Sequence, residues 1–303
     1  MKKIFTLLLL SSFTTIAVAQ DDAAALSISG TVDAYYQTNL SSPDDLGDSF
    51  GTSFANETGF ALGMANLVAS YETGSTGVVA DVVFGPRGDA AVGGYNLNQL
   101  YAYWNVNETT TLTMGRWNTY LGYEVISPAG NFNYSTSYMF SSGPFSMVGL
   151  KADFSLSDDF SLMLAVMNPT DVNNNTSGGY SLGAQLGYKG QYLNLYFDDD
   201  EVLGFEVDYT GGFDLSEEFF LGINAAYQVS HDAGFYGAAL YPQYTVSDSF
   251  ALGLRGELFG LHAEDLDDLP SVFSTTLTGS YTVDNLTIKP EIRMDAWSEL
   301  EPY

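Results

Sequence analysis

Apolar and polar residues alternate along the chain in segments of about ten residues, which turn residues separate. The clearest segment places Leu252, Leu254 and Leu258 on one face, and Arg255 and Glu257 on the other. A period of two predicts β-strands rather than helices. About fifteen such strands are predicted, at 25–37, 58–71, 76–85, 96–106, 109–118, 146–156, 160–168, 180–188, 191–198, 203–214, 218–229, 235–246, 249–259, 272–283 and 286–295.

The connections between these strands alternate in length as well. The tight turns lie at 107–108, 157–159, 189–190, 216–217, 247–248 and 284–285. The longer connections lie at 38–57, 86–95, 119–145, 169–179 and 260–271, and two of the same series, 199–202 and 230–234, are short. Short turns on one rim and long loops on the other are typical of outer-membrane barrels. Alternation by itself also fits a soluble sandwich, whose polar face meets water.

The predicted fold is therefore all-β, a transmembrane antiparallel up-and-down β-barrel. Bacterial single-chain barrels have an even number of strands. We expect about sixteen strands, of which about fifteen are present and the last is missing beyond Tyr303, with fourteen as the alternative count. Residues 20–303 are expected to form this one domain.

Residues 1–19 have the features of a secretory signal peptide. Lys2 and Lys3 precede an apolar stretch, and Ala17-Val18-Ala19 is a cleavage site of the small-x-small type. The alternative is a short N-terminal helix. After residue 19 no apolar run is long enough for a membrane-spanning helix, so entry into a membrane would require a closed barrel.

Composition excludes several classes of protein. The chain has 37 acidic and 9 basic residues, a net charge of −28 and no cysteine. Nucleic-acid binding needs a basic surface, and disulfide scaffolds need cysteine, so both are excluded. Oxygen donors at 171–178 and 198–201 would suit calcium, but the glycine and glutamate spacing of a calcium-binding hand loop is absent. We interpret them as solvated acidic loops and predict no metal site and no cofactor.

Several stretches of the chain resemble the OmpL-like beta-barrel porins of Gram-negative outer membranes. The resemblance is carried by 59–67, 113–124, 127–135, 149–153 and 168–171. It implies a barrel in the outer membrane that passes small solutes, with lipid and lipopolysaccharide around it. Members of the family usually continue to a last strand that ends in an aromatic residue. No functional residues are carried over from the family, and a homo-oligomer is left open.

The charged residues within strands are the candidates for a pore lining. An Arg or Lys that faces lipid at mid-membrane costs roughly 2–4 kcal/mol, so charged side chains are expected to face the lumen. For Arg116, a position at the membrane interface is the alternative. We also expect ion-pair ladders, such as the one from Lys289 to Asp295, to fix the wall. The predicted lining residues in strands are Arg116, Lys151, Asp153, Glu206, Asp208, Arg255, Glu257, Lys289, Glu291, Arg293 and Asp295.

The longest connection, 119–145, is the candidate constriction. Long loops in compact folds are usually functional or mobile, and this loop carries a single acid, Glu124. We expect the loop to fold into the lumen, with Glu124 facing wall bases that include Arg116. The alternative is an outer loop packed on the rim.

These patterns predict a porin for passive diffusion of small hydrophilic solutes and ions, with a modest preference for cations. A substrate-specific channel and a surface-binding or adhesin barrel without general pore activity are the alternatives. An enzyme is not expected, because His231 and His262 lie in predicted loops outside any recognisable Ser-His constellation.

Overall fold

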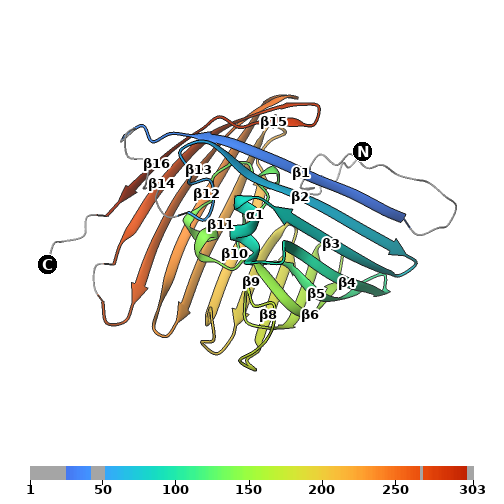
Figure 1. Cartoon of the computed structure of the whole chain (residues 1–303). Helices are drawn as coiled ribbons and strands as arrows, with labels where there is room; N and C mark the ends of the chain where they lie inside the picture. The colour runs from blue at the N-terminus through green and yellow to red at the C-terminus, as the bar shows by residue number, and fades with distance from the viewer. Residues whose placement is uncertain (1–24, 42–51, 267–268, 299–303) are drawn as a thin grey trace.

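The computed structural model describes residues 25–41, 52–266 and 269–298, so the predicted signal peptide at 1–19 lies outside the described residues. One antiparallel sheet of 16 strands curves around a central space (Figure 1). No described helix has the length and apolar character needed to cross a membrane. The strands are β1 (Ala25–Gln37), β2 (Gly59–Thr73), β3 (Thr76–Phe84), β4 (Leu97–Asn107), β5 (Thr110–Asn118), β6 (Ser146–Ser155), β7 (Phe160–Met167), β8 (Ser181–Tyr188), β9 (Gln191–Phe197), β10 (Phe205–Asp214), β11 (Phe219–Ser230), β12 (Ala233–Ser247), β13 (Phe250–Ala263), β14 (Ser271–Val283), β15 (Leu286–Ile288) and β16 (Glu291–Trp297).

The strands follow one another around the sheet in chain order, so the prediction of an up-and-down arrangement of about sixteen strands is confirmed. The alternative count of fourteen is wrong. β15 and β16 both pair with β14 and together occupy the single strand predicted at 286–295. Pro290 lies between them, and because proline has no N–H to donate, the ladder is interrupted at this point.

The first and last strands of the sheet have free edges within the described ranges. There, β1 pairs with β2 alone, and β15 and β16 pair with β14 alone. The expectation of a further closing strand beyond Tyr303 stays a prediction.

The two faces of the sheet are inverted relative to a soluble protein. On β13, Leu252, Leu254 and Leu258 point outward and are 38–49% exposed, whereas Arg255 and Glu257 are fully buried inside. A soluble sandwich would bury the leucines and solvate the charges. The observed arrangement is the one that a barrel in lipid requires, because hydrocarbon accepts leucine and rejects ionised groups.

Two tight turns on one rim share a structure that their common sequence pattern explains. The Oγ atoms of Ser157 and Ser216 each accept the N–H of the phenylalanine that starts the next strand, at 3.1 Å. That phenylalanine's carbonyl in turn accepts the N–H of Leu156 or Leu215, at 2.9 and 2.8 Å. The repeated aliphatic-Ser-acid-x-Phe pattern therefore encodes a hydroxyl that satisfies backbone donors where the ladder ends.

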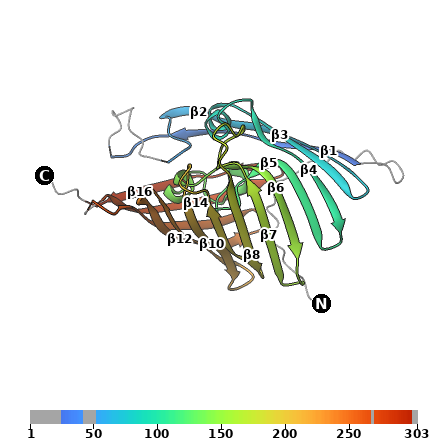
Figure 2. The same ribbon diagram turned by 90° about the horizontal axis from the view of Figure 1, so that it is seen from below.

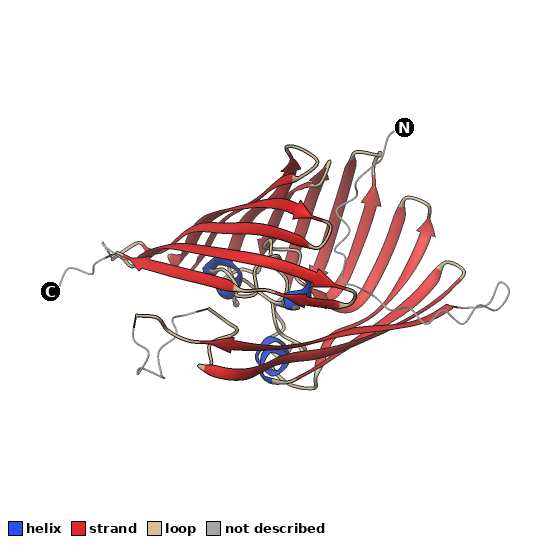
Figure 3. Ribbon diagram, turned by 90° about the horizontal axis from the view of Figure 1, so that it is seen from above, coloured by secondary structure: helices blue, strands red, loops and turns tan. Residues whose placement is uncertain are grey.

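The opposite rim carries the longer connections, and two of them hold three short helices that the sequence analysis did not predict. The helices are α1 (Pro86–Val92), the 3₁₀ turn η1 (Pro128–Gly130) and α2 (Tyr138–Ser142). Seen from above, the helices lie within the space that the strands surround (Figure 3). The interior of the barrel is therefore partly occupied by its own connections.

The outward face can be tested with a charge at mid-strand. Leu254→Arg is expected to lower the free energy of unfolding in lipid vesicles by about 2–4 kcal/mol, because the guanidinium would meet hydrocarbon. Leu215→Arg, in a tight turn at the rim, is the matched control and is expected to cost about 0–1 kcal/mol. Urea unfolding followed by tryptophan fluorescence measures both, and equal costs would contradict an outward, lipid-facing Leu254.

Candidate functional site

The connection 119–145, between β5 and β6, crosses the interior of the barrel (Figure 2). Three of its residues bind widely separated strands. The Tyr134 hydroxyl donates to Asp33 on β1 at 2.5 Å, and the Gly122 N–H donates to Asp208 on β10 at 3.0 Å. The Asn133 side chain donates to Thr278 on β14 at 2.7 Å. Because β10 lies far around the sheet from β1, the loop spans the lumen and does not pack on the outer rim.

A buried ion pair fixes the loop to the wall. Arg255 on β13 donates to Glu124 at 2.6 Å, and the two side chains are 0% and 3% exposed. Arg255 also donates to the Ser135 carbonyl at 2.7 Å, and the second Glu124 oxygen accepts the Ser137 N–H at 2.6 Å. These added hydrogen bonds offset part of the desolvation cost of the buried pair, although the Arg255 Nε atom is buried without a partner.

Glu257, two residues further along β13, caps the helix inside the loop. Its carboxylate accepts the N–H groups of Tyr138 and Met139, at 3.0 and 2.9 Å, in the first turn of α2. The Oγ of Ser137 accepts the Phe140 N–H at 3.0 Å and completes the cap. The first N–H groups of a helix have no partner within it, so a carboxylate at this end both accepts hydrogen bonds and meets the positive end of the helix.

The charged side chains from Lys289 to Asp295 bind the loop more than one another. Glu291 accepts the N–H groups of Tyr134 and Ser135, at 2.8 and 3.1 Å, and Lys289 donates to the carbonyls of Pro128 and Asn131. Within this stretch, Arg293 and Asp295 form the one ion pair among the described residues, at 2.8 Å. The expected four-residue ladder is thus a single pair flanked by two side chains that hold the loop.

Two tyrosines add hydroxyl donors from the loop. Burial, together with Asp33, raises the pKa of Tyr134, and burial also raises the pKa of Tyr138, whose hydroxyl donates to Asp295 at 2.8 Å. Both phenols therefore stay protonated and can donate to carboxylates. A third, Tyr123, stacks on Tyr241 with ring centroids 4.3 Å apart.

Glycines on the inner wall leave the space that loop side chains occupy. A Cβ on Gly222 would come within 2.3 Å of the Tyr123 hydroxyl, and one on Gly253 would come within 2.3 Å of the Phe132 ring. A Cβ on Gly183 would likewise clash with Tyr120, and one on Gly237 would clash with Met139. The wall is therefore shaped to this loop, since any larger residue at these positions would displace the loop side chain.

The remaining predicted residues lie apart from the ion pair. Lys151 and Asp153 bind each other at 2.9 Å, with side chains 23% and 41% exposed. Arg116 pairs in register with the outward-facing Leu100, and it donates to the Asn98 carbonyl and to the side chain of Asn173. The structure therefore gives Glu124 the partner Arg255 and does not bring Arg116 to it.

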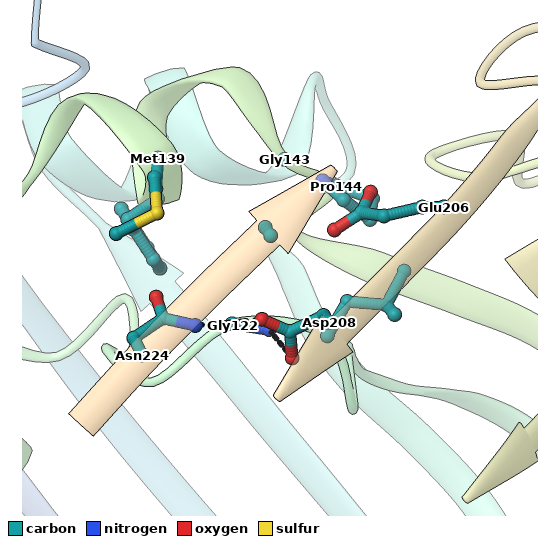
Figure 4. Close-up of a pocket in the computed structure, with 10 residues that line it drawn as sticks. Gly122, Met139, Gly143, Pro144, Glu206, Asp208 and Asn224 are labelled. Atoms are coloured by element: carbon teal, nitrogen blue, oxygen red, sulfur yellow. Dashed lines mark hydrogen bonds between the residues drawn. The ribbon is translucent and has the colours of Figure 1, made fainter. Parts of the chain in front are cut away.

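Glu206 and Asp208 both point inward from β10 and lie beneath the loop (Figure 4). Neither residue has a basic partner within 4.0 Å in the part of the chain that is described. The role of all these side chains in lining a pore stays a prediction.

Arg87 in α1 is a residue that the predicted lining missed. It donates to the Ile126 carbonyl at 2.7 Å, and its guanidinium lies 4.6 Å from the centre of the Phe54 ring. Burial lowers its pKa, whereas Asp33 raises it. The scarcity of bases in the chain is the signal that could have drawn attention to it.

A family model described as "Putative beta-barrel porin-2, OmpL-like" matches residues 25–302. The chain belongs to this OmpL-like porin family. A porin role and a place in the outer membrane follow at the level of the family, and the resemblance seen in the sequence is confirmed.

Two solved structures share the fold of this porin. One, described as "Asymmetric conductivity of engineered proteins", has a TM-score of 0.52 and 14% identity, and covers 90% of this chain and 100% of its own. The other is outer-membrane expressed OmpT of Vibrio cholerae, with a TM-score of 0.51, 10% identity and coverage of 92% and 89%. At such identities the likeness concerns the fold alone. No curated protein matches the chain.

The ion pair between loop and wall can be tested by removing one charge. Glu124→Gln is expected to lower the free energy of unfolding by about 3 kcal/mol, because Arg255 would stay buried without its partner. Asp153→Asn is the control, since its half-exposed pair with Lys151 is expected to contribute less than about 1 kcal/mol. Urea unfolding measures both. A cost for Glu124→Gln no larger than that of the control would show that the pair does not hold the loop.

Proposed function

We propose that this porin is a passive diffusion channel for small hydrophilic solutes and ions, with 119–145 as its constriction. The observation that carries the proposal is the attachment of this loop to strands far apart around the sheet, to Asp33 on β1 and to Asp208 on β10. A loop held at both sides narrows the channel without depending on the membrane or on a partner.

The width of the barrel supports a water-filled passage. Eight strands enclose space that side chains fill, whereas barrels of about sixteen strands leave an aqueous channel. Here the loop takes part of that space and leaves the wall around Lys151 and Asp153 partly exposed. A lining with charges of both signs orients polar solutes and excludes apolar ones.

The balance of charge supports a modest preference for cations. Inward-facing acids outnumber inward-facing bases, and most of the bases are engaged by an acid or by the loop backbone. Further acids, such as Asp158, Glu217 and Asp248, lie exposed in the tight turns at one mouth. Acidic mouths concentrate cations within a Debye length of about 8–10 Å.

The constriction can be tested by deletion. Removing 124–142 is expected to raise single-channel conductance and to admit larger sugars in liposome swelling, because the loop would no longer occupy the lumen. Removing 173–178, on another connection of the same rim, is the control and should change neither. Heat-modifiable gel mobility verifies that each variant folds.

If conductance and the size cutoff stay the same after 124–142 is removed, the loop is not the constriction. If swelling depends on the identity of the sugar rather than on its size, the substrate-specific channel is the better description.

The charge balance predicts the sign of the reversal potential. In a tenfold KCl gradient across a planar bilayer, the reversal potential is expected to have the sign of cation preference. It should fall well short of the value for an ideally cation-selective channel, because Lys151 and the other bases of the inner wall repel cations. Raising the ionic strength should weaken the preference through screening. A potential of the opposite sign, indicating anion preference, would refute the proposal.

A further inference from the structure

A small cavity lies between the loop 119–145 and the inner face of β10 and β11. Its volume is about 10 Å³, which is room for roughly one water molecule or ion. It is lined by both ends of the loop, at Gly122 and Pro144, and by the wall residues Glu206, Asp208 and Asn224 (Figure 4). The cavity therefore lies where the loop leaves and rejoins the wall.

Glu206 is the unusual residue of this cavity. It is 2% exposed, and its Oε2 atom has no hydrogen-bond partner. Its carboxylate points toward the loop near Pro144 (Figure 4). A buried carboxylate oxygen without a partner is costly, so such a group in a native structure calls for a ligand, a proton or a partner.

Asp208 places a second carboxylate beside the first. Asp208 is 1% exposed and lies two residues after Glu206 on the same face of β10, so the rise of a strand places their Cα atoms about 7 Å apart. Its oxygens accept hydrogen bonds from the Gly122 N–H at 3.0 Å and from the side-chain amides of Asn194 and Asn224, at 2.7 and 2.6 Å. All three donors are neutral, so two acids share the cavity and no base offsets them.

Glu124 and Glu257 differ in this respect, whereas the buried Asp81 on β3 also meets only neutral side-chain amides. Glu124 has Arg255, and Glu257 has the two N–H groups that begin α2. At Glu206 and Asp208, two buried acids thus lie side by side, and neither has a basic partner among the described residues.

We propose that this cavity binds a divalent cation of the calcium type, with Glu206 and Asp208 as its protein ligands. Two carboxylates match the charge of such an ion, and carboxylate oxygens are the ligands that hard cations prefer. Asn224 uses its N–H group on Asp208, which leaves its carbonyl oxygen as a further donor. The sequence analysis predicted no metal site, so the proposal departs from it.

The bound cation fixes both ends of the loop to β10. The Gly122 N–H already binds Asp208, and Pro144 adjoins Glu206 across the cavity. The proposal concerns binding alone and does not depend on which solutes the channel passes.

Terbium luminescence tests the site directly. The probe is Tb³⁺ added to the full chain, folded in detergent and freed of metal with a chelator; Ca²⁺ is the competitor. Tyr120 of the loop interacts electrostatically with both carboxylates, and its phenol ring serves as the sensitiser. We expect a tight Tb³⁺ signal that Ca²⁺ displaces, and at least a tenfold loss of its affinity in Glu206→Gln.

Glu217→Gln is the matched control, because it makes the same change at the exposed turn between β10 and β11. It should keep the tight signal, and weak binding to surface acids should be the same in all variants. Glu206→Gln keeps the shape of the side chain, and gel mobility verifies its fold. The absence of a tight signal in the folded wild-type chain, or an equal signal in Glu206→Gln, would overturn the site. Neither result would bear on conductance.

Discussion

The cost of placing an ionised group in hydrocarbon organises this barrel from the single strand upward. Since a strand turns alternate side chains to opposite faces, the constraint appears in the sequence as a period of two. On β13 it places Leu254 outside and Arg255 inside. The same rule leaves the interior with charged and hydrogen-bonding groups that need partners. Water in an open lumen is one source of such partners, and other parts of the chain are another.

The loop 119–145 supplies most of those partners from the chain itself. Its backbone N–H groups meet Glu257 and Glu291, and its carbonyls meet Lys289. Such contacts use the backbone, so they depend on the path of the loop more than on its side chains. The shape of the wall adds to this, because Gly222 and Gly253 open space for Tyr123 and Phe132. In this barrel the polar inner wall and the inserted loop therefore match each other in both hydrogen bonding and shape.

Sequence reasoning reached the strands because alternation is a local signal, and it identified the loop by its length. It could not assign partners within the lumen, because Glu124 and Arg255 lie 131 residues apart and meet only through the curvature of the whole sheet. The nearer Arg116 was the wrong partner for Glu124, since its register places it beside the outward Leu100. The helices α1 and α2 have 7 and 5 residues, too few for a helical period to appear.

The buried carboxylates of the lumen show how environment separates residues that look alike in the sequence. Glu257 and Glu206 both lie on inward faces of their strands, and both are at least 98% buried. Glu257 faces the start of a helix and lies two residues from a base, so its charge is used in holding the loop. Glu206 faces a cavity the size of one ion, beside another acid. The difference arises from which part of the loop passes each strand. The same fold that neutralises one carboxylate with the chain's own atoms leaves the other with room for a cation from solution.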